Sequence, residues 1–269
     1  MQNTSIAIDL YHGGSEMNQL ENRPRIVIAL GGSILLPSLH THAISEYVPV
    51  ISEIAVKAQV YIVVGGGKIA RQYINVCRSI GTDEAAADEI GIAVTRINAS
   101  LLISALGDVA YPLVPVTYHE ALSYGFSGRV VVMGGVVPGQ TTDAVSAVLA
   151  ERVGASLLVN VTSVDGIYSA DPNDPAYAKT ARRYDTITTT KLLEIVQQGS
   201  MRAGSNNVMD LVAVKMIDRC RVPLVVLDGR EPANVLSALE TGTFAGTVVS
   251  ENGISPLPLF PRIGVESVR

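Results

Sequence analysis

The chain has 269 residues and a formal net charge of −5, with 48% hydrophobic and 17% charged residues. This length suits one large α/β domain or two closely packed lobes around a sizeable core. Proteins that bind duplex DNA or an anionic membrane are usually basic, so the charge disfavours a nucleic acid or a membrane as partner.

Strand and helix patterns alternate along most of the chain. Short apolar runs predict strands at residues 25–30, 59–64, 111–116, 129–133, 156–161, 222–227 and 247–250. Periodic or capped segments predict helices at residues 42–57, 68–80, 84–106, 142–153, 189–199 and 207–219, a short helix with a Thr117–Glu120 capping box, and a helix that begins at Glu231-Pro232. Such alternation is typical of a mainly parallel sheet with helices on both faces. We therefore predict an α/β fold, a three-layer αβα sandwich.

The segments outside this alternation have little periodicity. Residues 1–24 are predicted to be a loose N-terminal extension, in which Met17 is an alternative start, and residues 251–269 a loose C-terminal tail. Residues 166–186 are rich in turn formers and predict an inserted hairpin or flap. We expect no signal peptide and no apolar run of the ~18 residues that span a bilayer. Two cysteines without CxxC spacing fit a reducing compartment, so we expect a cytoplasmic protein.

Glycine-rich loops follow four of the predicted strands, at residues 31–33, 65–68, 134–142 and 162–166. In open α/β sheets, ligands bind beyond the carboxyl ends of the strands. Backbone N–H groups of such loops, and the helix N-termini that follow them, can bind an anion. A single glycine pair is more often only a tight turn, but four such loops together favour a phosphate-binding site.

Two common phosphate-binding motifs are missing. There is no GxxxxGK[ST] sequence, because Ile69 follows Lys68, and no GxGxxG sequence follows a strand. The four histidines have no zinc spacing, and no GxSxG sequence occurs. The sequence therefore disfavours a P-loop protein, a typical dinucleotide binder, a zinc enzyme and an α/β-hydrolase.

The order of the remaining motifs resembles the amino-acid-kinase family. These are GGS at 31–33, VVGGGKIAR at 63–71, PGQTTDA at 138–144, NVTSVDGIYSADP at 160–172 and AGS at 203–205. The resemblance covers about residues 25–250, and GGGKIAR with PGQTTDA is similar to its archaeal-type UMP kinase branch. It implies the amino-acid-kinase fold, with a UMP-binding acceptor lobe at 25–153 and an ATP-binding lobe at 154–250.

The resemblance also implies an activity and its requirements. It implies an ATP-dependent UMP kinase of pyrimidine nucleotide biosynthesis, which transfers the γ-phosphoryl of ATP to UMP and gives UDP and ADP. Mg²⁺ would enter with ATP, without a protein ligand that can be named, and the enzyme would be a homohexamer built from three dimers. Two alternatives stay open: another small-molecule kinase of the same fold, and a protein that stores oxyanions.

The resemblance implies roles for individual residues at matching positions. The residues that would bind ATP are Ala29, Leu30, Gly31, Gly32, Ser33, Gly67, Arg71, Thr162, Tyr168 and Asp171. The residues that would bind UMP are Gly66, Asp88, Val136, Val137, Pro138, Gly139, Gln140, Thr141 and Thr142. The candidate catalytic residues are Arg71, Lys68 and Asp165.

Several of these residues also have a structural interpretation. Asp88 would by itself be an exposed helix acid, Thr142 a helix N-cap and Tyr168 a packed aromatic residue. Asp143 and Asp165 would be acids that complement a helix dipole.

One position departs from the family pattern. Many members have a lysine where this chain has Ala29. Charge stabilisation would then depend on Mg²⁺, Lys68, Arg71 and backbone amides, with Arg202 and Lys215 as further candidates. Since a phosphate monoester is largely dianionic near neutral pH, with a second pKa of about 6, the reaction needs no general base. The lack of a Ser–His or Cys–His pair is consistent with this chemistry.

Overall fold

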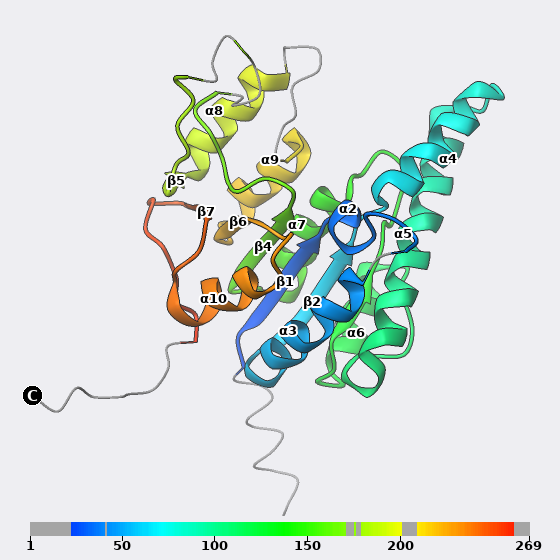
Figure 1. Cartoon of the computed structure of the whole chain (residues 1–269), viewed down its shortest axis with the longest axis horizontal. Coiled ribbons are helices and arrows are strands. Elements are labelled where there is room, and N and C mark those ends of the chain that lie inside the picture. The colour runs from blue at the N-terminus through cyan, green and yellow to red at the C-terminus, as the bar shows by residue number, and fades with distance from the viewer. Residues whose placement is uncertain (1–22, 41, 171–174, 176–178, 201–208, 261–269) are drawn as a thin grey trace, which may run out of the picture.

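The computed structural model describes residues 23–40, 42–170, 175, 179–200 and 209–260 (Figure 1). The strands are β1 (Arg25–Leu30), β2 (Gln59–Val64), β3 (Val131–Met133), β4 (Leu157–Thr162), β5 (Thr186–Thr188), β6 (Leu224–Asp228) and β7 (Gly246–Ser250). The helices are α2 (Gly32–Leu35), α3 (Ala43–Lys57), α4 (Gly67–Ser79), α5 (Glu84–Leu106), η1 (Gly107–Val109), α6 (Tyr118–Gly125), α7 (Thr142–Val153), α8 (Thr189–Ser200), α9 (Leu211–Cys220) and α10 (Ala233–Thr241).

The strands form one sheet in the order β3-β2-β1-β4-β6-β7-β5. Neighbouring strands are parallel except for the antiparallel pair β6–β7. The chain builds the sheet outward from β1 through β2 to β3, and then outward on the other side through β4 to β6. Ligands of open α/β sheets bind beyond the carboxyl ends of the strands at such a reversal. The topology therefore places a candidate site at the ends of β1 and β4.

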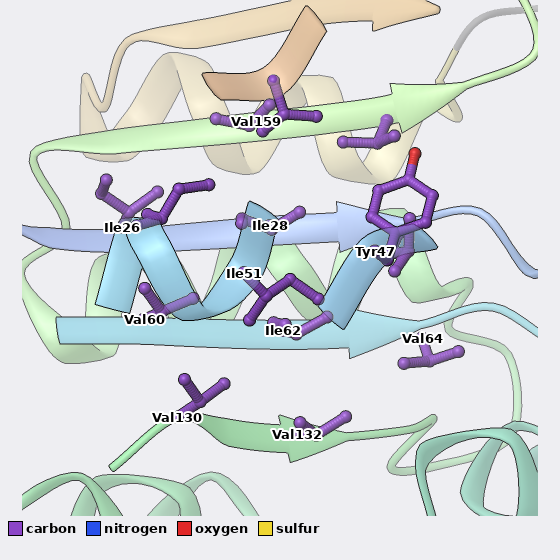
Figure 2. Packing of buried hydrophobic residues seen from close by; sticks show 14 of the residues in the cluster. Ile26, Ile28, Tyr47, Ile51, Val60, Ile62, Val64, Val130, Val132 and Val159 are labelled. Carbon is purple, nitrogen blue, oxygen red and sulfur yellow. The ribbon is translucent and has the colours of Figure 1, made fainter. Parts of the chain in front are cut away.

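Helices cover both faces of the sheet, as a three-layer αβα sandwich requires. Buried side chains of α3, α5 and α10 form one apolar cluster with the sheet, and those of α6, α7, α8 and α9 form a second cluster on the other face. Figure 2 shows Tyr47 and Ile51 of α3 packed over Ile28 of β1 and Ile62 of β2. Every residue of β2 is buried, which is typical of a parallel strand covered on both sides. The predicted α/β fold is confirmed.

One predicted strand is wrong. Residues 111–116 form no strand, and the pairing here is a single isolated bridge between Ala110 and Val130. Pro112 and Pro115 interrupt the segment, and proline has no N–H with which to continue a ladder. The short elements α2 and β5, of four and three residues, were not predicted.

The predicted loose C-terminal tail is wrong for its first part. The N–H groups of Leu259 and Phe260 both donate to the carbonyl oxygen of Leu239 in α10, at 2.9 Å each. Leu257, Leu259 and Phe260 also pack against the core cluster on this face. Burial of apolar side chains outweighs the local lack of periodicity. Residues 1–22 and 261–269 lie outside the described residues.

The division into two lobes stays a prediction. β1, from the first predicted lobe, pairs with β4, from the second, over Ile26–Leu157 to Leu30–Val161. One sheet therefore continues through both.

The segment Glu84–Val109, which contains α5, is long and apolar enough to cross a membrane by length and composition. By this criterion the expectation that no run reaches that length is wrong. About 44% of its most apolar window is buried inside the protein, where Ala99 and Leu102 are fully covered. The polar side chain of Asn98 is also buried in the interior. These features are those of a core helix.

Candidate functional site

Two glycine loops touch at the carboxyl ends of β1 and β2. A Cβ atom on Gly32 would lie 2.2 Å from the carbonyl oxygen of Gly65 and 2.4 Å from the nitrogen of Gly67. Gly67 itself has a φ of +64°, a conformation that only glycine adopts readily. Glycine is therefore required because the two backbones are in direct contact. The loops also join the sheet, since Gly31 N–H donates to Val161 and Gly65 N–H donates to Leu30, both at 2.9 Å.

The N-terminus of α4 opens from this contact. Gly66 is its N-cap residue, and no side chain caps the helix. The first N–H groups of a helix lack intrahelical partners and form an anion-binding site. Arg71, one turn later, donates from Nη2 to Ser33 Oγ at 3.1 Å, and Lys68 is exposed beside it. The arrangement offers backbone donors and two cations to one anionic group.

The inner side of α5 holds two of the loops. Asn98 donates from Nδ2 to the carbonyl oxygen of Gly65 at 2.9 Å, and Thr95 Oγ1 accepts from Gly135 N–H at 2.7 Å. Two turns nearer the start of the helix, Asp88 Oδ2 accepts from Gly139 N–H at 2.8 Å. The loop at residues 134–141 therefore runs along α5 for about 10 Å. Asp88 is more than an exposed helix acid, because it holds this loop.

The same loop is joined to the second half of the chain. Thr141, not Thr142, is the N-cap of α7, and its Oγ1 accepts from Ala144 N–H at 3.1 Å. Its hydroxyl donates to Asp210 Oδ2, while Asp210 Oδ1 caps α9. Tyr118 donates its hydroxyl to Gln140 Oε1 at 3.1 Å. The loop is thus fixed by α5, α6 and α9.

Asp143 lies in the first turn of α7 beside this contact. Burial, with additional repulsion from Asp210, raises the pKa of Asp143 to about 7. A carboxyl group with such a raised pKa next to a second carboxyl group is a frequent sign of a functional site. Sequence reasoning interpreted Asp143 only as a turn or helix-dipole acid. Asp210 lies beside Asp143 in the fold although it is distant in sequence, so the sequence alone does not reveal that the two carboxyl groups interact.

A hairpin base lies at the end of β4. Ser169 N–H donates to Arg182 and Tyr184 N–H donates to Ile167, both at 2.9 Å, as the predicted flap requires. Asp165 accepts from Tyr168 at 3.0 Å and from Arg183 Nη1 at 3.1 Å. These contacts support a bracing function for Asp165, whose catalytic role stays a prediction. Sequence reasoning did not single out Arg183.

The other predicted residues are placed as follows. Ala29 is 3% exposed in β1, between Val63 of β2 and Asn160 of β4. Leu30 is buried, Lys215 is exposed on α9, and the carbonyl oxygen of Thr162 accepts from Gly229 N–H at 2.8 Å. Asp171, Arg202 and the AGS sequence at 203–205 lie outside the described residues. Val136, Val137, Pro138 and Thr142 lie on or next to the loop held by α5.

The site therefore combines interlocked glycine loops, an uncapped helix N-terminus and a second loop beside it, at the reversal point of a parallel sheet. This arrangement defines an α/β protein that binds phosphate groups. The sequence model of the amino acid kinase family matches residues 24–228. The chain belongs to this family.

The relatives agree with this assignment. The chain is 54% identical over 237 residues to a protein named uridylate kinase from Methanospirillum hungatei, which covers 88% of this chain and 99% of that protein. It is 55% identical over 234 residues to a uridylate kinase from Methanoculleus marisnigri, over 87% of this chain and 99% of the relative. A crystal structure of uridylate kinase from Archaeoglobus fulgidus superposes with a TM-score of 0.75 and 44% identity, over 84% of this chain and 99% of that chain.

Asp143 generates a testable prediction about pH. Because folding raises its pKa from 3.8 to about 7, its contribution favours the folded state at low pH and is lost as pH rises through 7. The side chain of Asp143→Asn stays neutral at every pH. The melting temperature of this variant minus that of the wild type should therefore rise by about 2 °C or more from pH 4 to pH 8. Thermal unfolding of the nucleotide-free protein measures this. Asp218→Asn, which alters an exposed carboxyl group on α9, is the matched control. A constant difference for Asp143→Asn would contradict the prediction.

Proposed function

We propose that the protein is a UMP kinase that transfers the γ-phosphoryl group of ATP to UMP and releases UDP and ADP. The observation that carries the proposal is the juxtaposition of two phosphate-binding features. The glycine loops and the N-terminus of α4 lie next to the threonine-rich loop held by α5. The names of relatives at 54% and 55% identity support the same activity. They give no support to another acceptor or to oxyanion storage.

The two substrates would approach from the two sides of the glycine contact. UMP would lie along α5, with its phosphate near Gly66, its ribose at Asp88 and its base against residues 136–142. ATP would extend from residues 29–33, Gly67 and Arg71 toward Thr162 and Tyr168, and Asp171 stays a predicted contact of ATP. Because β1 and β4 are adjacent, the ends of both strands are available to the triphosphate. We place this reaction in cytoplasmic pyrimidine nucleotide synthesis.

Catalysis would rest on positioning and charge stabilisation. The phosphate of UMP is a nucleophile without deprotonation, so a phosphate oxygen forms the new P–O bond as the bond to ADP breaks. Backbone N–H groups of α4, Lys68 and Arg71 would hold the negative charge on the transferring group. Ala29 leaves no cation at the end of β1, and its methyl group is enclosed in the sheet. The cations on α4 are therefore the candidates for this task.

We propose Mg²⁺ as the cofactor. This ion is usually bound by substrate phosphates, waters and one or two carboxylates. Asp143 and Asp210 would be its carboxylates, because a cation beside them would offset both the burial and the repulsion from Asp210 that raise the pKa of Asp143. When bound, Mg²⁺ neutralises charge on the β- and γ-phosphates.

The activity has a direct test. Purified protein with ATP, Mg²⁺ and UMP should form UDP, and UMP should be preferred to CMP, AMP and GMP in kcat/KM. Excess EDTA should abolish turnover, and added Mg²⁺ should restore it. Anion-exchange chromatography of the products measures each reaction. A folded protein that forms no UDP under these conditions contradicts the proposed function.

Arg71 gives a second test of the site. Arg71→Ala removes the guanidinium group beside the glycine loops, so turnover should fall by about tenfold or more with little change in melting temperature. Steady-state kinetics of UDP formation measure the change. Arg78→Ala, on the far end of the same helix, removes only an exposed pair with Glu84 and should retain turnover. An unchanged rate in Arg71→Ala would remove this residue from the site.

We also propose that the protein is a homo-oligomer, with the hexamer that the resemblance implies. Support comes from the outer face of α5, where Ile90, Ile97 and Leu101 are 42%, 59% and 44% exposed. Exposed apolar patches of this kind often mark protein–protein contacts. Light scattering coupled to size exclusion should give a multiple of 28.4 kDa. Ile97→Lys should lower that mass, whereas Val56→Lys, on the exposed side of α3, should not. A wild-type monomer would overturn this proposal.

A further inference from the structure

Arg96 of α5 donates two hydrogen bonds to the start of the loop that precedes α7. Its Nε donates to the carbonyl oxygen of Gly135 at 3.2 Å, and its Nη2 donates to that of Val136 at 3.4 Å. On the neighbouring position of the helix, Thr95 Oγ1 accepts from the N–H of Gly135 at 2.7 Å. Two adjacent side chains of one helix therefore hold the N–H and carbonyl groups of Gly135 and the carbonyl group of Val136.

These two hydrogen bonds from Arg96 fix the direction of two peptide groups. The peptide bonds after Gly135 and Val136 are trans, so each carbonyl points opposite to the N–H group of the same peptide plane. Because both carbonyls point to Arg96, the N–H groups of Val136 and Val137 point away from it. Within the described residues, neither of these N–H groups has an acceptor. Both N–H groups are therefore available to a ligand.

The apolar surroundings of these donors suit an uncharged group. Val136 and Val137 have apolar side chains, and Pro138 follows them. The charge of Arg96 lies on the opposite side of the peptide planes. A phosphate group is better served by the N-terminus of α4, where the cations Lys68 and Arg71 lie.

We infer that Arg96 is a positioning residue that aims the N–H groups of Val136 and Val137 at a carbonyl group of the pyrimidine base. This inference rests on the proposed UMP kinase function and gives its base selectivity a physical origin. At the position where uracil has a carbonyl acceptor, cytosine has an amino donor. Donors facing donors would leave both sides unpaired, so CMP would be rejected.

Kinetics test the inference with the intact enzyme. Arg96→Met retains the length of the side chain but not its donors, so the KM for UMP should rise about tenfold. The UMP-to-CMP ratio of kcat/KM should fall by a similar factor, while the KM for ATP stays within about twofold. Arg96→Lys should give an intermediate loss, because an ammonium group lacks the planar fork that reaches two carbonyls. Arg78→Met, on the adjacent helix, is the matched control and should behave like the wild type.

Hydrogen exchange of the nucleotide-free protein separately tests whether Arg96 holds the loop. Arg96→Met should accelerate exchange of peptides that contain Gly135 and Gly139, and leave peptides of β6 unchanged. Unchanged loop exchange together with unchanged base selectivity would overturn the inference. An equal rise of both KM values with a lower melting temperature would also overturn it, since it would show a purely structural role. If Arg96→Met does not fold, the same comparisons on Arg96→Lys decide. A wild-type enzyme that forms no UDP would contradict the proposed function and the assignment of the base. Hydrogen exchange would still show whether Arg96 holds the loop.

Discussion

The contact between the two glycine loops is the constraint on which the site depends. Gly32 and Gly65 approach so closely that a single methyl group on Gly32 would overlap a backbone oxygen. This contact sets how near the ends of β1 and β2 come to each other, and therefore where α4 begins. The uncapped N-terminus of α4 lies against β1 because no side chain separates the two loops. An enzyme that transfers a phosphoryl group between two anionic substrates needs this proximity, since its overall charge repels both of them.

A second level of organisation comes from α5. Its inner side carries Asp88, Thr95 and Asn98, each of which holds a loop, while its outer side exposes apolar side chains such as Ile97. A long helix is stiffer than any of the loops that it supports. The spacing of side chains along α5 therefore sets the relative positions of the loops. The link from Thr141 to Asp210 then joins this assembly to α9 in the other half of the chain.

Much of this arrangement could be predicted from the sequence, and the exceptions have physical reasons. Strand–helix alternation and the capping box of Thr117 and Glu120 are local signals, and the corresponding helices are confirmed. Residues 111–116 have a strand-like composition, but prolines break the ladder. The tail at 257–260 lacks periodicity and is ordered by contacts with a distant helix. Arg96 and Arg183 were not singled out, and Asp143 was interpreted only as a helix-dipole acid, because their partners are distant in sequence or are backbone atoms, which composition does not reveal.

The central position of β1 has a consequence for biosynthesis. This strand leaves the ribosome first among the strands, yet Ile26 pairs with Leu157 and the core beneath it also receives Phe260. The apolar edge of β1 that receives β4 must therefore stay unpaired while most of the chain is translated. Long-range parallel pairing of this kind forms slowly and leaves aggregation-prone strand edges unpaired until it is complete. The edge of β1 therefore stays open to non-native pairing until β4 has been synthesised.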